Sequence, residues 1–490
     1  MQRFNSRSLR LDIFKRLPER FPGNSWTPYR NYMTRAHKSI NRFHAENHIP
    51  GLEDQHRLSS SPAYSYSSQS TNAGFENLDV ESIGRLVSHD GDYYSGFFKH
   101  FRVKSAFQPI YSLAHKRIIG YEALARAMDS DKQTVNPAQL FSLEKKESDI
   151  IFLDRLCRYV HINNFGGLED HINWLFLNVA PQTIMNGKFY GSFFGDLLKK
   201  FNFSPHRVVI EIVEHPIAKK DNERLQETVE YYKELGNLIA IDDFGAGHSN
   251  FDRIWMLQPH IVKLDRSMLV KASTEKNIRR MLQGIVSLLH QGGALVLIEG
   301  VETEEQAMIV MESDADFVQG YFFSRPSENL DQIRSTRVPF DKLFDSYKTL
   351  STFRGRESMQ IYNRYYKIFN DAIQRIKEDH SLVGACDGLF REASAVRCYQ
   401  LMPNGIQVGH TVVSESYSEN ADLRFKPLED ARSADWFRRH YLIRAIMHPD
   451  QLQITRPYLS ITGAHMCITL SMMFSTESGD RVLCCDLNIE

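Results

Sequence analysis

Leu238-Ile239-Ala240-Ile241-Asp242-Asp243 is a short apolar run that ends on two carboxylates. Six other short apolar runs end in the same way, on a carboxylate, an amide or an amine. In chain order, the polar residues that end the runs are Glu122, Asn178, Glu211, Asp242 with Asp243, Lys263, Glu299 and Gln319. Such runs without alternating polarity are typical of strands buried on both faces, as in a parallel sheet. Polar groups at the carboxyl ends of successive parallel strands form the active site of a (β/α)8 barrel.

The segments between these runs predict the crossover helices of such a barrel. Residues 148–160, 221–235 and 275–290 carry apolar residues at helical spacing, and Gly236 and Gly292 follow the last two segments as stop signals. Strand and helix alternate about every 25–35 residues, which is the pattern of βαβ units. The sequence therefore predicts an α/β fold with a barrel domain at 86–335, close to the usual length of about 250 residues.

The rest of the chain divides into three parts. Residues 1–85 are basic and rich in Ser, which predicts a poorly ordered N-terminal region; a transit peptide or a weak contact with nucleic acid or lipid is the alternative. Residues 336–380 have helical spacing, and Gly355 predicts a break into two connecting helices. Residues 381–490 carry short strands and turns such as Asn404-Gly405, which predict antiparallel hairpins in a separate α+β domain.

Composition predicts a folded cytoplasmic protein. The chain has 490 residues, 42% of them hydrophobic, and a formal net charge of −1, which argues against a general binder of polyanions. No apolar run approaches the ~20 residues of a membrane span. The six cysteines form no CxxC pair and follow no signal peptide, which favours buried free thiols. Redox sensing by Cys484-Cys485 is the alternative.

The predicted barrel mouth carries the ligands of hard cations. Carboxylate and amide oxygens from Glu122, Asn178, Glu211 and Asp242 suit Mg²⁺ or Mn²⁺. Asp243 lies next to Asp242, so one aspartate can bridge two ions, and two ions stabilise both oxygens of a phosphodiester displacement. Lys263 can orient or acidify water, and Glu299 can accept its proton. Alternatively such groups only close strand ends, which explains any one of them but not all seven positions together.

Phe107-Gln108-Pro109-Ile110 and Glu122-Ala123-Leu124-Ala125-Arg126 resemble the opening motifs of EAL domains, phosphodiesterases of the bacterial messenger cyclic di-GMP. The family's other motifs follow in order at residues 177–179, 211–214, 242–247, 263–265, 299–302 and 319–321. The resemblance covers roughly residues 100–335 and implies a modified (β/α)8 barrel. It also implies hydrolysis of cyclic di-GMP to linear pGpG by a homodimer with a two-ion Mg²⁺ or Mn²⁺ site. A catalytically weak cyclic di-GMP receptor is the alternative.

The resemblance implies a role for each matching residue. Its metal ligands are Glu122, Asn178, Glu211 and Asp242 for the first ion, and Asp242 with Asp243 for the second. Its catalytic residues are Lys263, Glu299 and Glu122, and its substrate-binding residues are Gln108, Leu124, Arg126 and Gln319. Glu214 is expected to brace the loop after Asp243, which links metal binding to dimer contacts in the family.

Residues 381–490 look like a Cache or PAS-like sensor domain. This resemblance implies a pocket for an unknown small ligand, lined by Trp436, Arg439, Tyr441, Tyr458 and Asp486, because aromatic walls with a few polar groups suit such sites. The alternative is that these residues are core aromatics and surface charges of a small sheet. We expect the helices near 340–378 to carry the state of this domain to the barrel.

Overall fold

The computed structural model describes residues 79–91, 93–142, 144, 146–167, 170–186, 192–213, 222–247, 251–379, 381–415, 431–460 and 465–489. The chain divides into the units Met1–Thr71 and Asn72–Glu490, and all described residues belong to the second. The N-terminal region predicted to be poorly ordered therefore lies outside the described residues, except for positions 79–85. Glu214, the predicted loop brace, also lies outside them.

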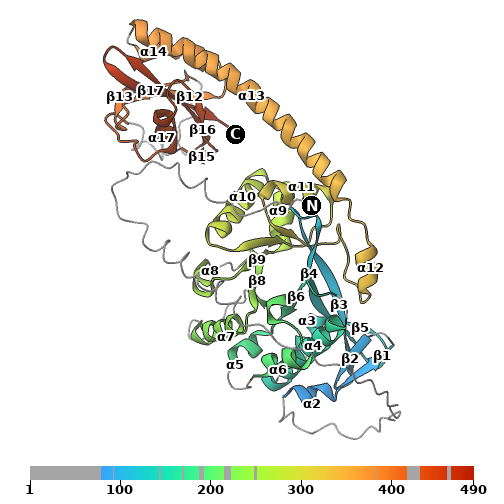
Figure 1. The fold of residues 1–490 in the computed structure, drawn as a ribbon. Coiled ribbons are helices and arrows are strands. Elements are labelled where there is room, and N and C mark those ends of the chain that lie inside the picture. Colours follow the sequence, from blue (N-terminus) through green and yellow to red (C-terminus); the bar gives the residue numbers. More distant parts are fainter. Residues whose placement is uncertain are drawn as a thin grey trace, which may run out of the picture. The chain divides into compact units, whose positions relative to one another are not determined.

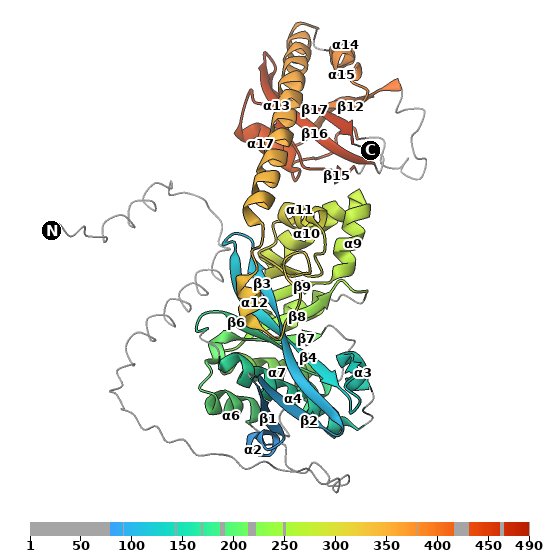
Figure 2. The same cartoon turned by 90° about the vertical axis from the view of Figure 1, so that its right-hand side faces the viewer.

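Eight strands close into a barrel, as the sequence predicted (Figures 1 and 2). Seven run parallel to one another, from β4 through β6, β7, β8, β9 and β10 to β11. The eighth, β3, is antiparallel to both β4 and β11 and closes the ring. The strands are β3 (Phe101–Ser112), β4 (Arg117–Met128), β6 (Trp174–Asn178), β7 (Val208–Val213), β8 (Leu238–Phe244), β9 (Ile261–Leu264), β10 (Leu295–Ile298) and β11 (Phe317–Val318).

Helices form the crossovers between the parallel strands. The predicted helices at 148–160, 221–235 and 275–290 correspond to α4 (Glu147–Gly166), α7 (Asn222–Glu234) and α10 (Lys276–Gln291). The other helical elements of the barrel are α3 (Pro137–Ser142), α5 (Pro181–Asn186), α6 (Phe193–Lys200), η3 (Pro205–Arg207), α8 (Phe251–Leu257), α9 (Arg266–Thr274), α11 (Glu304–Ser313) and α12 (Leu330–Ser335). Gly236 follows α7 with φ +95°, a left-handed conformation that glycine adopts without steric cost.

Side-chain alternation along the strands creates two cores. An inner cluster fills the barrel with Ile110, Phe176, Val209, Ala240, Ile261, Leu297 and Phe317, one from each of seven strands. Intervening residues such as Leu177, Ile210 and Val262 belong to an outer cluster that includes the covering helices. Because side chains two residues apart share a face, the residue two positions after each inner core residue in a parallel strand also faces inward. In the six parallel strands that contribute to the inner cluster, those positions are Asn178, Glu211, Asp242, Lys263, Glu299 and Gln319.

Among the described residues, elements that pack against the barrel precede the predicted boundary at residue 86. Helix α2 (Val80–Gly84) is capped by Asp79, whose Oδ1 accepts a hydrogen bond from Ser82 N at 2.7 Å. Val80 and Ile83 of this helix are buried in the outer core. Strands β1 (Val87–Asp90) and β2 (Tyr93–Phe98) extend the sheet beyond β3, and the short β5 (Thr134–Val135) pairs with β4. The prediction missed α2 because one turn of helix is too short to show periodicity.

A single helix, α13 (Phe340–Asp379), follows α12, so the prediction of two connecting helices was wrong. Gly355 lies inside α13, and a Cβ at this position would have no neighbour within 4 Å. A glycine in an exposed helix costs only about 1 kcal/mol relative to alanine. That cost is outweighed because Leu343 packs in the outer barrel core, while Phe369 packs in the core of the following domain.

The chain after α13 forms an antiparallel sheet with helices, which confirms a second α+β region. Its strand order is β13-β12-β17-β16-β14, and β15 pairs with β16. The elements are α14 (Leu382–Ala385), α15 (Asp387–Phe390), β12 (Ala395–Leu401), β13 (Gln407–Val413), α17 (His440–Met447), β14 (Gln453–Ile454), β15 (Tyr458–Leu459), β16 (Met466–Thr476) and β17 (Gly479–Asn488). Its Cache or PAS-like character stays a prediction. Among helices of the described residues, none combines the length and apolarity needed to cross a bilayer.

Candidate metal and phosphodiester site

Lys263 lies at the centre of the polar cluster at the barrel mouth. Its Nζ is 2.6 Å from Glu211 Oε1, 2.7 Å from Glu299 Oε1 and 2.9 Å from Asp242 Oδ1. Glu122 Oε1 is 3.8 Å away. The lysine side chain is only 1% exposed, so four carboxylates from different strands surround one buried ammonium group.

Glu122 joins this cluster to a chain of amides. Asn178 Nδ2 donates to Glu122 Oε1 at 3.1 Å, and Gln319 Nε2 donates to Glu122 Oε2 at 2.8 Å. Gln319 Nε2 also donates to Gln108 Oε1 at 3.1 Å. Only glycine fits at position 320, next to Gln319, because a Cβ at this position would lie 2.1 Å from the carbonyl oxygen of Val301. Because Asn178 donates through its amide nitrogen, its amide oxygen takes no part in this hydrogen bond.

The donor set fits a divalent cation. Asp242, Asp243 and Glu299 offer oxygens that all lie within 4.8 Å of one another. Glu211 is completely buried, and neither of its carboxylate oxygens has a hydrogen bond of normal geometry in the described part of the chain; the ion pair to Lys263 is its close polar contact. Lys263 compensates Oε1, whereas Oε2 has no donor among the described residues, and a buried carboxylate oxygen without a donor is costly unless a cation binds it. All of these donors are oxygens, which Mg²⁺ and Mn²⁺ prefer.

Burial and like charges raise the pKa values of the acidic groups. Burial raises the pKa of Glu211 well above its usual value although Lys263 opposes the shift, and it raises the pKa of Glu299 to about 8 against the same opposition. Burial, followed by the neighbouring Asp242, also raises the pKa of Asp243. Burial alone would lower the pKa of Lys263, but the surrounding carboxylates outweigh it and hold that pKa well above its usual value. The surrounding carboxylates therefore favour the charged form of Lys263.

Two cavities are lined by residues of the cluster, one by Glu122 and Glu299 and the other by Asn178. One, of about 280 Å³, is lined by Gln108 and Gln319. The other, of about 310 Å³, is lined by Leu124 and Arg126 together with Asn178. The four residues expected to bind substrate therefore divide into two pairs around the carboxylates.

Sequence reasoning missed a residue in each of these cavities, Arg266 in the first and His161 in the second. Arg266 lines the first cavity and pairs with Glu302 at 2.7 Å, and Tyr321 lies there under the guanidinium of Arg325 at 4.3 Å. Arg266 had no signal in the sequence, although Glu302 and Tyr321 were within the motifs. In the second cavity the buried His161 was also missed, because the sequence singled out this helix, α4, only for the spacing of its apolar residues.

His161 is buried as a neutral base. Its Nδ1 is 2.8 Å from Ser105 Oγ, and burial, with a smaller effect of Arg126, lowers its pKa from 6.5 to about 3. Between these values the unfolded chain binds a proton that the folded chain does not, so stability falls as the pH falls. We expect His161→Gln to reduce the stability lost between pH 7 and pH 5 by about 2 kcal/mol. Denaturant unfolding at both pH values measures this difference.

The matched control for this prediction is His100→Gln, because His100 is exposed in the same unit. It should keep the pH dependence of the unchanged chain. An identical loss of stability on acidification in His161→Gln and in the unchanged chain would contradict the burial of a neutral imidazole.

The predicted sensor residues cluster around Tyr399 in the second domain. The Tyr399 ring centroid is 6.5 Å from that of Trp436 and 6.4 Å from that of Tyr441. The Arg439 guanidinium is 5.8 Å from the Trp436 ring and 6.0 Å from the Tyr458 ring. Tyr441 belongs to a packed apolar cluster, which agrees with the alternative of a core aromatic.

Asp486 lies at the same cluster but is fully buried and already paired. Its Oδ2 accepts from Arg397 Nε at 2.7 Å, and its Oδ1 accepts from Thr469 Oγ1 at 2.6 Å. The sequence did not single out Arg397 as its partner, because the two lie on neighbouring strands that are distant in the chain. A ligand pocket lined by these residues stays a prediction.

Residues 94–326 match the family model described as EAL domain. The chain is 24% identical over 360 residues to an uncharacterized EAL-domain containing protein, YkuI of Bacillus subtilis, which covers 71% of this chain and 84% of YkuI. It is 28% identical over 226 residues to the cyclic di-GMP phosphodiesterase RocR of Pseudomonas aeruginosa, covering 45% of this chain and 56% of RocR. The oxygen sensor protein DosP of Escherichia coli is 27% identical over 230 residues, which are 46% of this chain and 28% of DosP.

Solved structures agree with the sequence matches. A crystal structure of YkuI, with an EAL domain and in complex with substrate c-di-GMP and calcium, aligns with a TM-score of 0.67 at 23% identity. The alignment covers 79% of this chain and 96% of that chain, so the shared fold extends beyond the barrel. Together the comparisons support the assignment of the barrel to the EAL family and do not identify the second domain as Cache or PAS-like.

Proposed function

We propose that this chain is a phosphodiesterase that depends on divalent cations and hydrolyses cyclic di-GMP to linear pGpG. The observation that carries the proposal is the convergence of oxygen donors from Glu122, Asn178, Glu211, Asp242, Asp243 and Glu299 around Lys263. The similarity to RocR, a cyclic di-GMP phosphodiesterase, supports this choice of substrate.

The same donors would hold the cations, Mg²⁺ or Mn²⁺. Glu122, Asn178, Glu211 and Asp242 are proposed for one ion, and Asp242 with Asp243 for the other. Two bound ions would supply positive charge to the attacking and leaving oxygens of the phosphodiester. Glu299 lies in the same cluster of oxygens, so a role as ligand fits the geometry as well as a role as proton acceptor.

The protein's own residues would position water and balance charge. In the reaction, the water oxygen would form a bond to phosphorus, the bond from phosphorus to the 3′ oxygen would break, and that oxygen would take a proton from solvent and leave as a hydroxyl. Lys263, which stays protonated, would orient the water by its charge, and Glu299 would accept the proton that the water loses. Glu122 would hold the side-chain amides of Asn178 and Gln319 in position through the hydrogen bonds described above.

The two cavities described above fit a two-fold dinucleotide laid across the cluster. One guanine would bind beside Gln108 and Gln319, and the other beside Leu124. Arg126 would hold a phosphate, because its guanidinium makes paired hydrogen bonds to phosphate oxygens. We further propose that the enzyme is a cytoplasmic homodimer, and that α13 transmits the state of a ligand-binding second domain to the barrel.

Purified full-length chain incubated with cyclic di-GMP and Mg²⁺ or Mn²⁺ tests the proposal. We expect pGpG by chromatography, no product in EDTA, and a rate at least about 100-fold lower in Glu122→Ala, because a metal ion contributes several kcal/mol to the transition state. Glu305→Gln, on the exposed face of α11, is the matched control and should keep full activity.

Calorimetric titration with cyclic di-GMP in Ca²⁺ separates the alternative function. Tight binding without pGpG formation would favour a receptor over an enzyme. Neither binding nor turnover would contradict both.

A further inference from the structure

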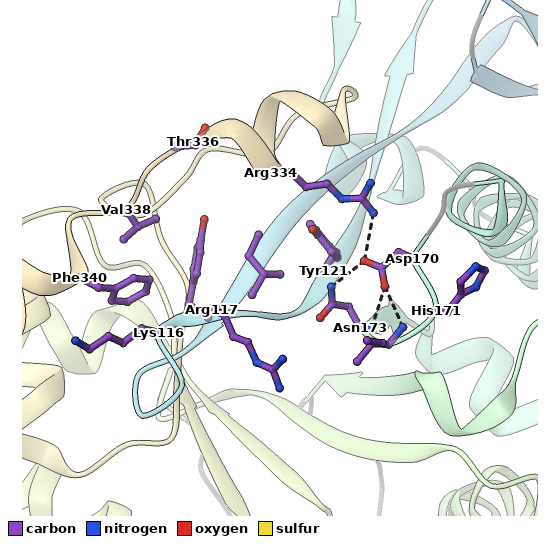
Figure 3. Close-up of a pocket in the computed structure, with 13 residues that line it drawn as sticks. Lys116, Arg117, Tyr121, Asp170, His171, Asn173, Arg334, Thr336, Val338 and Phe340 are labelled. Atoms are coloured by element: carbon purple, nitrogen blue, oxygen red, sulfur yellow. Dashed lines mark hydrogen bonds and ion pairs between the residues drawn. The ribbon is translucent and has the colours of Figure 1, made fainter. Parts of the chain in front are cut away.

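A separate cavity lies at the end of the barrel opposite to the carboxylate cluster. It is lined by residues from the carboxyl end of β3, the start of β4, the loop before β6, and the link between α12 and α13 (Figure 3). These are the amino ends of the parallel strands, whereas the carboxylates lie at their carboxyl ends. The cavity measures about 570 Å³, which is within the range of small-molecule sites. The proposed phosphodiesterase reaction does not use it.

Positive charge dominates the lining. Arg117, Lys116 and Arg334 line the cavity, as does His171, against a single carboxylate, Asp170. Figure 3 shows Arg334 and Asp170 on one side, Phe340 and Lys116 on the other, and Arg117 between them. Within the described residues, the Arg117 side chain has neither an ion pair nor a hydrogen bond.

Asp170 cannot neutralise Arg117, because its oxygens are already engaged. Arg334 Nη2 lies 3.3 Å from Oδ2, and Arg207 Nη2 lies 3.5 Å from Oδ1. Oδ2 also accepts from Asn173 Nδ2 at 2.7 Å, and Oδ1 from the backbone N–H of Asn173 at 3.0 Å. Two guanidinium groups therefore share one carboxylate. Outside the lining, Asp341 lies 2.9 Å from Lys116 and Asp331 lies 3.7 Å from Arg334, so among the described residues Arg117 is the lining arginine whose positive charge has no ion pair.

Aromatic side chains form the apolar part of the wall. Tyr111, Tyr121 and Phe340 are buried and line the cavity. Tyr111 is only 3% exposed, and Ser324 is a hydrogen-bonding neighbour of its hydroxyl.

We propose that this cavity binds a phosphate-bearing small molecule of about mononucleotide size. Phosphate is favoured as the anion because guanidinium groups match its oxygens in pairs, and the aromatic wall suits the ring of an organic phosphate. Thr336, Val338 and Phe340 of the lining belong to the link that leads into α13. The bound molecule therefore contacts the base of the long helix as well as the barrel.

Calorimetric titration of the full-length chain in EDTA tests the site, with inorganic pyrophosphate and adenosine monophosphate as probes. Without divalent cations the carboxylate cluster repels phosphate, so binding reports on the positive cavity. We expect both probes to bind, and uncharged adenosine not to. Arg117→Met should weaken binding about tenfold, the usual contribution of a hydrogen bond to a charged group, and Arg117→Glu should weaken it further.

Arg280→Glu on the exposed face of α10 is the matched control, because Arg280 is outside the cavity lining. It should bind the probes like the unchanged chain. Arg117 is exposed, so both of its variants should keep the melting temperature of the unchanged chain. Absence of binding by the unchanged chain, or equal affinity in Arg117→Glu, would overturn the proposal while leaving the phosphodiesterase proposal untouched.

Discussion

Lys263→Met is expected to destabilise the metal-free barrel by about 3 kcal/mol, because it removes the only ammonium group that contacts the carboxylate cluster within the described residues. Methionine keeps the length and apolar volume of the lysine stem, so the change isolates the charge. Glu211, Asp242 and Glu299 would then repel one another in a site from which water is largely excluded. Turnover of cyclic di-GMP should fall at least about 100-fold as well, the typical effect of removing one stabilising charge.

The destabilisation by Lys263→Met should depend on pH and on metal. Carboxyl groups whose pKa is raised by folding bind more protons in the folded state, so their burial becomes more costly as the pH rises from about 4.5 to about 8. Lys263 opposes the raised pKa of Glu299, so its removal should raise that pKa further, and the difference in unfolding free energy between Lys263→Met and the unchanged chain should grow as the pH rises above about 8. Divalent cations compensate the same negative charge, and Mn²⁺ should raise the melting temperature of the variant more than that of the unchanged chain.

Denaturant unfolding in EDTA and in Mn²⁺, at pH 8 and pH 9.5, measures both effects. Lys271→Met is the matched control, because Lys271 is exposed on α9, the helix that follows β9. It should change neither stability nor metal response. If Lys263→Met were as stable as the unchanged chain in EDTA at pH 9.5, Lys263 would not be the counterion of the cluster.

The positions of the metal-site residues could be predicted because they depend on local rules. Each polar residue closes an apolar strand, and a parallel barrel brings all strand ends to one rim whatever the details of packing. Glu122 shows the limit of this reasoning. It lies in the middle of β4, which continues to Met128 because it pairs with β3 over its whole length. That pairing is with β3, which immediately precedes β4 and forms a hairpin with it, and no pattern within β4 alone predicts it.

Features that depend on contacts between distant segments were not predicted. Gly355 signals a helix break locally, but packing at both ends of α13 outweighs it. The Arg397–Asp486 pair joins two strands that become neighbours only in the folded sheet. The positive cavity likewise combines Arg117, Asp170 and Arg334, which are each unremarkable in sequence. Local spacing therefore predicts strand ends and helices, and tertiary pairing decides lengths, partners and cavities.

Asp243→Asn is expected to separate metal-dependent function from stability. Asp243 has φ +58°, the left-handed region that Asp and Asn tolerate better than other residues with a Cβ, so asparagine changes the charge and little else. It removes a half-buried carboxylate that stands beside Asp242 and whose pKa is raised by burial and by that neighbour. The metal-free variant should therefore melt at the same temperature as the unchanged chain or above it.

Function should respond in the opposite direction. Loss of a negatively charged oxygen donor from the second proposed ion site should lower turnover of cyclic di-GMP at least about 100-fold, because the ion contributes several kcal/mol to the transition state. Asp243→Ala should lose the same activity but also about 1 kcal/mol of stability through backbone strain. Asp371→Asn, an exposed position on α13, should change neither quantity. Melting in EDTA and pGpG formation in Mn²⁺ measure the two effects. An Asp243→Asn protein that retains full activity would show that the second cation is held without this carboxylate.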